Sequence, residues 1–452
     1  MPNAFAYLIF FSWPVFVLWL LFTYPVKKAI FTAITLATLL LPAAFSVDPP
    51  FIPPLDKNTI TVISIPIFLF LLGKNFDIFK SGFITKLFIV YFIALIVSVE
   101  LNSLPIISAT KYLPGLTQYD AFSEIIRAIL YALPFFLGRY FSTNLRETEE
   151  FYKMLVIMML IYTIPMLIEL RISPQLHYLI YGIVPADFIQ QVREGGYRPM
   201  VLLGHGLGLA FYVSTATVAA GALCKNKVRT TITSPFAIIV YLVIILVFCK
   251  TWSAMLYAFF GLIFIFKLKP TKQVKWSFII AVMFTLYPVA KVADVFPQEA
   301  IISAISQYSP ERAQSLDFRF KNEDEMLAHA MKKPFFGWGG WGRNRLYSTE
   351  DGRDLSVIDG RWIGELGVNG WIGFLLSYTI LLVPLYYAQK AIHYIKEPKD
   401  RVYFASLAIM LMICIVDSIP NTCMGPMHLF FAGILLAQSE LLIKQKYLLK
   451  NA

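Results

Sequence analysis

Charged residues are scarce in this sequence: they make up 15% of its 452 residues, whereas 58% are hydrophobic and 16% aromatic. The mean hydropathy is +0.66. A soluble domain of this length has no interior large enough to bury so much apolar surface, so lipid must be the solvent for much of the chain. The composition excludes an ordinary soluble enzyme and predicts an all-α, polytopic bundle of transmembrane helices.

Cysteine is scarce as well. The four cysteines lie in or beside apolar segments, at Cys224, Cys249, Cys414 and Cys423. Because their spacing matches neither a disulfide framework nor a metal site, we interpret them as reduced residues. No Asp-x-Asp motif stands out, and the acidic run at 323–325 is interpreted as helix surface. We therefore expect neither a metal nor another cofactor.

The sequence shows no evident internal repeat, and we do not expect a cleavable signal peptide. The first apolar stretch has no basic residues before it and no small-residue cleavage site. Transporters usually show two related halves, which this sequence does not. We therefore expect a single membrane domain over residues 1–452.

Apolar runs long enough to cross a bilayer, which takes roughly 20 helical residues, recur along the chain. They lie near 5–22, 29–47, 59–73, 87–101, 124–142, 154–172, 205–224, 235–249, 254–266, 276–292, 371–388, 404–420 and 427–443. Some neighbouring runs are separated only by short turns, so we expect 12 or 13 spans.

Lysine and arginine gather in every second connection between these spans. The basic residues are Lys27 and Lys28; Lys74, Lys80 and Lys86; Arg146 and Lys153; Lys225, Lys227 and Arg229; Lys267, Lys269, Lys272 and Lys275; Lys390, Lys396, Lys399 and Arg401; and Lys444, Lys446 and Lys450. Basic connections stay in the cytoplasm. The other connections then lie outside: 48–58, 102–123, 173–204, 250–253, 293–370 and 421–426.

The longest outer connection, 293–370, is the most polar part of the chain. Residues 311–332 have helical character, with Leu316, Phe320, Leu327 and Met331 on one face and Arg312, Arg319 and Glu323 near another. Pro334 ends this pattern, and the sequence PFFGWGGWG at 334–342 follows. Its four glycines allow sharp turns and a close approach to a ligand, whereas its tryptophans are equally typical of a membrane interface.

The same loop holds nine Lys or Arg against twelve Asp or Glu, so selected arginines must do any anion binding. An arginine fork suits a diphosphate because it binds two oxygens at once. The alternative is that these arginines pair with Asp317, Glu323 or Asp351 to organise the loop.

The second outer loop, 173–204, contains the sequence REGGYRP, with Arg193 and Arg198 on either side of Gly-Gly. His205 follows at the start of a predicted span, where it could accept a proton or cap the helix. Lys250 adds an outward cation in the tight turn between two spans. We regard this loop as a candidate second half of an anion site.

The order of these features resembles the bacterial O-antigen ligase and O-antigen polymerase superfamily of multispanning glycosyltransferases. The resemblance covers roughly 190–390 and includes the PFFGWG motif and the sequence ELGVNG at 365–370. It implies a multi-pass protein of the bacterial inner membrane with a periplasmic active face. It also implies that arginines at positions 193, 198, 312 and 319 engage an undecaprenyl-diphosphate-linked glycan, and we add Lys250 to this set.

The sequence departs from the ligases, which carry a histidine shortly before the Glu-x-Gly motif. Here residues 357–362 contain none, so the base is a choice among Asp359, His205 and Glu365. We therefore favour a polysaccharide polymerase, with an O-antigen ligase as the alternative. A lipid-linked glycan flippase is the alternative from another class, because Arg127, Arg139 and Glu169 lie in or near predicted spans.

The implied reaction is a direct displacement that inverts the anomeric centre without a metal. Cations would stabilise the leaving diphosphate, and a base would take the proton of the acceptor hydroxyl. Trp338, Trp341 and Trp362 are candidates for stacking on sugars. The expected partners are the lipid-linked glycan, an acceptor glycan or lipid, the membrane and other polysaccharide-assembly proteins, but no nucleic acid.

Overall fold

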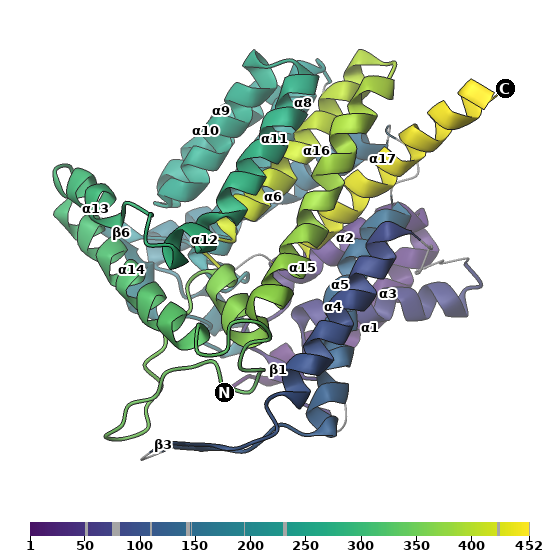
Figure 1. The fold of residues 1–452 in the computed structure, drawn as a ribbon. Helices are drawn as coiled ribbons and strands as arrows, with labels where there is room; N and C mark the ends of the chain where they lie inside the picture. Colours follow the sequence, from purple (N-terminus) through teal and green to yellow (C-terminus); the bar gives the residue numbers. More distant parts are fainter. Residues whose placement is uncertain are drawn as a thin grey trace.

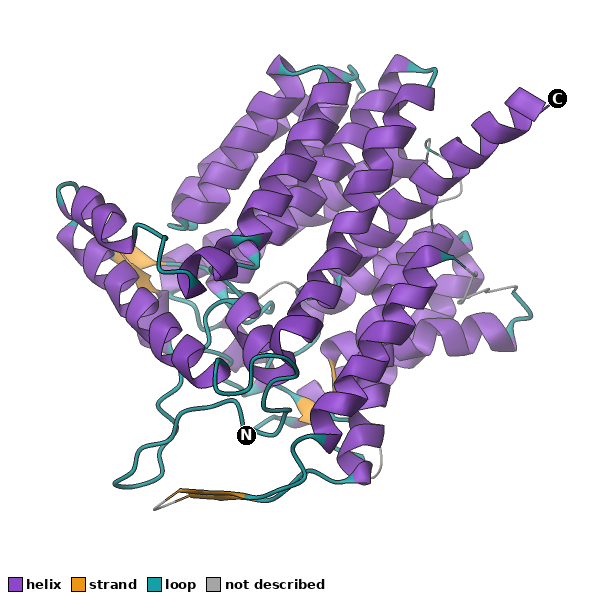
Figure 2. Cartoon of the chain, in the orientation of Figure 1, coloured by secondary structure: helices purple, strands orange, loops and turns teal. Residues whose placement is uncertain are grey.

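The fold is mostly helical, with 72% helix and 4% strand in the computed structural model (Figure 2). The structure describes residues 1–49, 53–74, 82–108, 111–141, 145, 147–193, 195–228, 233–422 and 425–451. Of the residues named above, Lys80, Arg146, Arg229 and Cys423 lie outside these ranges.

Each predicted span overlaps a helix. These helices are α1 (Ala4–Thr23), α2 (Val26–Leu40), α3 (Lys57–Leu71), α4 (Phe83–Glu100), α5 (Gln118–Phe141), α6 (Glu147–Ile172), α8 (Gly206–Lys225), α9 (Pro235–Phe248), α10 (Trp252–Lys267), α11 (Pro270–Thr285), α15 (Arg361–Ala391), α16 (Pro398–Asp417) and α17 (Met427–Asn451). Of these, α2 ends before the predicted limit of 47, and the span near 276–292 is divided between α11 and the short helix α12 (Tyr287–Val292). Among the described residues, eight helical segments are long and apolar enough to cross a membrane, and α3, α9 and α10 are shorter apolar helices. The number of helices that meet this criterion is thus smaller than the 12 or 13 spans expected.

Shorter elements lie in the connections. They are α7 (Leu176–Tyr181), α12 (Tyr287–Val292), α13 (Gln298–Ser306), α14 (Pro310–Ala330) and the 3-10 helices η1 (Phe188–Gln191) and η2 (Ile392–Tyr394). Three antiparallel strand pairs join β1 (Ser46–Val47) to β2 (Leu55–Asp56), β3 (Ile106–Ser108) to β4 (Lys111–Leu113), and β5 (Val192–Arg193) to β6 (Gly196–Tyr197). In Figure 1, α13 and α14 form a hairpin beside the bundle, and β3 projects from the end opposite the C-terminus.

The helix expected over 311–332 is present as α14, but one face was assigned wrongly. Glu323 is 6% exposed and packs inward with Phe320 and Leu327. Its carboxylate accepts a hydrogen bond from Tyr287 Oη at 2.6 Å, and burial raises its pKa. The acidic run at 323–325 is therefore not simply exposed helix surface. Asp324 forms an ion pair with Lys291 at 2.5 Å.

The connections predicted to lie outside contact one another at one end of the bundle, which we call the loop-rich end. The contacts are Lys57 Nζ to Leu203 O (2.9 Å), Lys250 Nζ to Arg193 O (2.7 Å), Asn102 Nδ2 to Gly337 O (3.1 Å), Arg361 N to Asn421 O (3.3 Å), and Arg312 over the ring of Trp252 (4.4 Å). These contacts connect all six of the predicted outer segments, so the segments share one side, as the alternation requires.

Six of the seven basic connections, all except the one that carries Lys74 and Lys86, are joined by a different group of contacts. The contacts are Lys27 to Glu147 (2.7 Å), Asn226 Nδ2 to Lys399 O (3.0 Å), Lys225 Nζ to Phe266 O (3.2 Å), Tyr403 Oη to Glu149 (2.9 Å) and Lys446 Nζ to Tyr394 Oη (2.8 Å). None of these contacts joins a basic connection to a predicted outer connection, in agreement with the predicted alternation of sides.

The long helix α15 is broken at Gly370, whose φ of 63° and ψ of −168° are not helical. The break frees the carbonyls of Gly367 and Val368, which accept hydrogen bonds from the N–H groups of Trp338 and Gly339, both at 2.9 Å. In return, the N–H groups of Trp371 and Ile372 donate to the carbonyls of Pro334 and Phe335, at 2.7 and 3.1 Å. The PFFGWG segment therefore satisfies the backbone groups that the break leaves unpaired.

This arrangement corrects the expectation that 361–370 is a loop. Residues 361–369 form a half-helix that precedes the break. Only glycine readily adopts the backbone angles of Gly370, and a Cβ there would lie 2.3 Å from Phe335 O. The close approach of the two chain segments thus explains why glycine stands at position 370.

Candidate functional site

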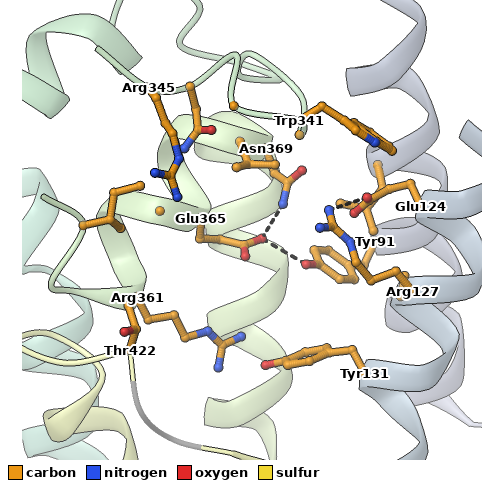
Figure 3. Close-up of a pocket in the computed structure, with 18 residues that line it drawn as sticks. Tyr91, Glu124, Arg127, Tyr131, Trp341, Arg345, Arg361, Glu365, Asn369 and Thr422 are labelled. Atoms are coloured by element: carbon orange, nitrogen blue, oxygen red, sulfur yellow. Dashed lines mark hydrogen bonds and ion pairs between the residues drawn. The ribbon is translucent and has the colours of Figure 1, made fainter. Parts of the chain in front are cut away.

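A cavity of about 470 Å³ opens at the loop-rich end. Its walls come from α4, α5 and the half-helix 361–369, and residues of the loop 340–345, Ile358 and Thr422 complete its lining. Figure 3 shows Glu365 near its centre, Arg361 and Tyr131 on one side, and Trp341 and Arg345 on the opposite side. The cavity therefore combines segments that are far apart in the sequence.

The half-helix presents its polar face to this cavity. Arg361, Glu365 and Asn369 recur every four residues, and Gly364 and Val368 lie between them on the same face. Residues four apart project from one side of a helix. The opposite face, with Trp362, Ile363 and Leu366, is buried in the protein core.

The Glu365 carboxylate is held by neutral donors. Its Oε1 accepts hydrogen bonds from Tyr91 Oη and Asn369 Nδ2, both at 3.0 Å (Figure 3). Among the described residues, no cation lies within ion-pair distance of this carboxylate. These two hydrogen bonds come from neutral donors and fix the direction of the carboxylate.

Arg361 is the matching cation, one helical turn away. Its guanidinium lies over the rings of Tyr131 and Tyr378, with centroid distances of 5.1 and 5.9 Å, and its Nη1 contacts His428 Nε2 at 2.9 Å. No carboxylate within the described ranges pairs with it. The positive charge of Arg361 is thus available to an anion.

The other arginines of the cavity are committed to carboxylates. Arg127 is paired with Glu124, and Arg345 with Asp354. Trp341 is 47% exposed, and its ring lies 5.9 Å from the Arg127 guanidinium. An exposed indole beside a polar cavity can stack on a sugar ring.

A second group of charges, which we call the basic cluster, consists of Arg193, Arg198, Lys250 and Arg319. Lys250 connects two members: its Nζ donates to Arg193 O at 2.7 Å, and its carbonyl accepts from Arg198 Nη2 at 3.2 Å. Arg198 is 7% exposed, and its Nε is buried without a partner among the described residues. Burial and then the charges of Arg193 and Arg319 lower the pKa of Arg198 to about 10.

Arg319 differs from Arg198 because it has a carboxylate partner. Its Nε lies 3.3 Å from Asp359 Oδ2, and its Nη1 lies 3.4 Å from Pro420 O. Asp359 immediately precedes Gly360 and Arg361, so the basic cluster and the cavity lie on either side of the start of α15. Because Asp359 already carries an ion pair, it is a weaker candidate base than Glu365.

His205 lies beside the basic cluster and caps α8. Its Nδ1 accepts a hydrogen bond from Leu207 N at 3.2 Å. Burial, followed by the charges of Arg198 and Arg319, lowers its pKa, whereas Asp359 raises it. The capping alternative is therefore the role that the contacts of His205 support.

Glu169 positions the segment that carries Arg198. This buried carboxylate of α6 accepts hydrogen bonds from the N–H groups of Leu176 (3.1 Å), Met200 (2.8 Å) and Val201 (2.8 Å). One side chain thus fixes both ends of the outer loop 173–204. The charge that suggested a transport pathway instead has a structural role.

The remaining predicted site residues lie apart from the cavity. Arg312 covers the ring of Trp252 at 4.4 Å. Trp338 stacks on His329, with ring centroids 4.5 Å apart, and donates to the carbonyl of the same residue at 2.9 Å. Trp362 is fully buried and packs edge-on against Tyr287. The ring of Trp362 has no exposed face, so the expectation that it stacks on a sugar is not supported.

Sequence reasoning missed Arg361, Tyr91, Tyr131 and His428. The aromatic residues lie in apolar runs, where they look like lipid-facing residues. Arg361 stands beside the recognised ELGVNG motif, and its four-residue spacing from Glu365 was the signal that could have identified it.

No protein-family model matches this chain, and no curated protein matches it in sequence. The fold and the site define its class: a mostly helical, multi-pass membrane protein by the length and composition of its helices, with a polar cavity at the loop-rich end of the bundle.

Proposed function

We propose that this chain is a membrane glycosyltransferase that polymerises a glycan carried on undecaprenyl diphosphate, with its loop-rich end on the periplasmic side of a bacterial inner membrane. The observation that carries the proposal is the pair Glu365 and Arg361. In one cavity, a carboxylate without a cationic partner faces the same space as a guanidinium without a carboxylate partner, among the described residues. A displacement reaction with an anionic leaving group needs both.

In the proposed reaction, Glu365 takes the proton from an acceptor hydroxyl as the hydroxyl oxygen attacks the anomeric carbon. The bond between that carbon and the diphosphate oxygen breaks on the opposite face, and both electrons leave with the diphosphate. Arg361 stabilises the charge that develops on this oxygen. The anomeric centre is inverted, and the residues named supply general-base and electrostatic catalysis without a metal.

The basic cluster supports a polymerase over a ligase. Polymerisation brings together two glycans that are each linked to a lipid diphosphate, and the loop-rich end has two separate places with available positive charge. We assign the donor diphosphate to Arg361 and the acceptor diphosphate to the basic cluster, in which Lys250 holds Arg193 and Arg198 together through backbone contacts. Trp341 is placed to stack on a sugar of the donor or the acceptor.

The intramembrane charges that favoured a flippase have structural partners. Arg139 forms a bidentate ion pair with Glu440, with contacts of 2.6 and 2.9 Å from Nη2. The Glu169 carboxylate is occupied by three backbone N–H groups. These charges are satisfied within the protein, so they do not support a transport path.

The test is a deletion strain complemented with the wild type or with Glu365→Gln, with the surface polysaccharide resolved on gels. A polymerase predicts that the ladder is lost while core plus one unit remains, and that Glu365→Gln fails to restore it. Loss of all attached glycan would indicate a ligase. Lipid-linked units that accumulate on the inner side would instead indicate a flippase. A full ladder with Glu365→Gln would remove Glu365 from the site.

A further inference from the structure

His428 lies behind the cavity wall, 3% exposed, in the first turn of α17. Its Nδ1 lies 2.7 Å from the carbonyl oxygen of Gly425. A carbonyl can only accept, so Nδ1 must carry a proton; a guanidinium can only donate, so Nε2 must be unprotonated and the ring neutral. Nε2 lies 2.9 Å from Arg361 Nη1, whose hydrogen bond it accepts, and 2.8 Å from Tyr131 Oη.

The imidazole is the directional contact of the Arg361 side chain. The rings of Tyr131 and Tyr378, which this guanidinium also contacts, attract the charge but do not fix the direction of the N–H groups. An arginine side chain loses considerable rotamer freedom when it is held in one geometry. Because a fixed acceptor already restrains the side chain, less conformational entropy is lost when an anion binds.

The chemistry of the acceptor also matters. Arg127 and Arg345 are held by carboxylates, which cancel their charge. A neutral imidazole orients a guanidinium and leaves its full positive charge for a ligand. His428 therefore orients Arg361 without neutralising it, whereas an acidic residue in its place would orient Arg361 but weaken anion binding.

We propose that His428 is a positioning residue that directs Arg361 toward a diphosphate group in the cavity. This inference rests on the proposed function, because it takes the ligand of Arg361 to be the diphosphate of a lipid-linked glycan. His428 itself does not line the cavity and contacts no ligand; it acts through Arg361.

Two substitutions form a matched pair for the test. His428→Gln places an amide oxygen near the position of Nε2, whereas His428→Asn places it near Nδ1, out of reach of Arg361. Binding of undecaprenyl diphosphate to the full-length protein in nanodiscs is measured by titration calorimetry. We expect Arg361→Ala and His428→Asn each to raise Kd about tenfold, equivalent to about 1.4 kcal/mol, and His428→Gln to stay within about threefold of the wild type.

The double variant Arg361→Ala/His428→Asn separates positioning from general disruption. If His428 acts through Arg361, the double variant binds no more weakly than Arg361→Ala alone, because residues that share one interaction are not additive. If His428→Asn does not fold, His428→Phe, which fills the ring volume and lacks an acceptor, takes its place.

Additive effects, or wild-type affinity in His428→Asn, would overturn the positioning role while Arg361→Ala still weakened binding. Failure of the wild type to bind undecaprenyl diphosphate would count against the ligand assigned under the proposed function. The two failures are thus distinguishable.

Discussion

The cavity and the basic cluster lie on either side of the start of α15, and they hold their arginines in different ways. In the cavity, Arg127 and Arg345 are neutralised by carboxylates, while Arg361 is held by an imidazole and two aromatic rings. In the basic cluster, Arg198 donates to a backbone carbonyl, and Arg319 pairs with Asp359.

From this difference we infer that the partner of an arginine, more than its position in a loop, decides whether it can bind an anion. A carboxylate partner cancels the charge, whereas a carbonyl or an imidazole orients the side chain and leaves the charge in place. By this criterion Arg361 and Arg198 are the available cations, and Arg319 becomes available only if a ligand displaces Asp359. Four predictions test the comparison.

Glu365→Gln should cause the largest loss. Without the carboxylate, no group in the proposed site takes the proton from the acceptor, and we expect polymer formation to fall by about 10²–10⁴-fold. The measurement is the initial rate of polymer formation by membranes that contain equal amounts of protein. Glu124→Gln is the matched control, because Glu124 is already paired with Arg127; a loss of less than about tenfold is expected there. Equal losses in both variants would contradict the distinction between paired and unpaired carboxylates.

Arg198→Ala should abolish visible polymer, and Arg319→Ala should reduce it less, because Asp359 already neutralises Arg319; neither change should alter protein abundance. Removal of one donor from an electrostatic site typically costs about 2.7–4 kcal/mol, which corresponds to a fall of about 10²–10³-fold. Polysaccharide gels and immunoblots of the same samples provide the measurement. Asp359→Asn releases Arg319 from its partner and sharpens the comparison: if Asp359 only restrains Arg319, this variant should keep more activity than Arg319→Ala. Full activity in either alanine variant would remove that arginine from the site.

Gly370→Ala should destabilise the protein by about 1–3 kcal/mol from backbone strain alone. The expected loss is larger because the new Cβ would lie 2.3 Å from Phe335 O. Thermal unfolding in detergent measures the change. Gly73→Ala is the matched control, since Gly73 also has a positive φ, of 64°, but has no atom within 4 Å of the added Cβ. Similar destabilisation in both variants would mean that the packing of 334–339 against the break contributes little.

The smallest expected effect is a decrease in stability at low pH, which arises from His205 beside the basic cluster. Burial and then Arg198 and Arg319 lower the pKa of His205 below that of an unfolded histidine, which is about 6.5. As the pH falls below about 6.5, the unfolded chain gains a proton that the folded chain does not, so the free energy of unfolding decreases until the folded pKa is reached. Arg198→Ala should raise the pKa of His205 and narrow this window.

Histidine-selective NMR across pH 5 to 8 measures the shift, with His205→Gln to assign the signal. An unchanged titration in Arg198→Ala would show that the cluster does not act on His205 through its charge.

The helices were predictable because apolar length is a local property of the sequence. Alternating basic connections also predicted which loops meet, since neighbouring helices must reverse direction. The half-helix 361–369 was missed because its break at Gly370 is stabilised by hydrogen bonds from 334–339, a segment more than twenty residues away. Within the sequence of 361–370 alone, the polar residues and glycines indicate a loop.

The same break decides which tryptophans are exposed. Trp341 and Trp362 both stand next to glycine in a polar segment, yet Trp341 is 47% exposed and Trp362 is fully buried. Trp362 lies on the buried face of the half-helix 361–369, which was not predicted, whereas Trp341 lies in a loop. The sequence also offered no indication that Tyr91 bonds to Glu365, or that His428 lies near this site. These three residues belong to three helices that are far apart in the chain.

The hydrogen bonds exchanged at Gly370 have a consequence for how this protein can be cut and tagged. An excised fragment of 293–360 would leave the carbonyls of Pro334 and Phe335 and the N–H groups of Trp338 and Gly339 without their partners on α15. Such a fragment should not keep its native fold as an autonomous ectodomain. An epitope inserted at the exposed turn 350–352 should be tolerated. One inserted at 334–339 should disrupt the hydrogen bonds to α15 and displace the half-helix that carries Glu365.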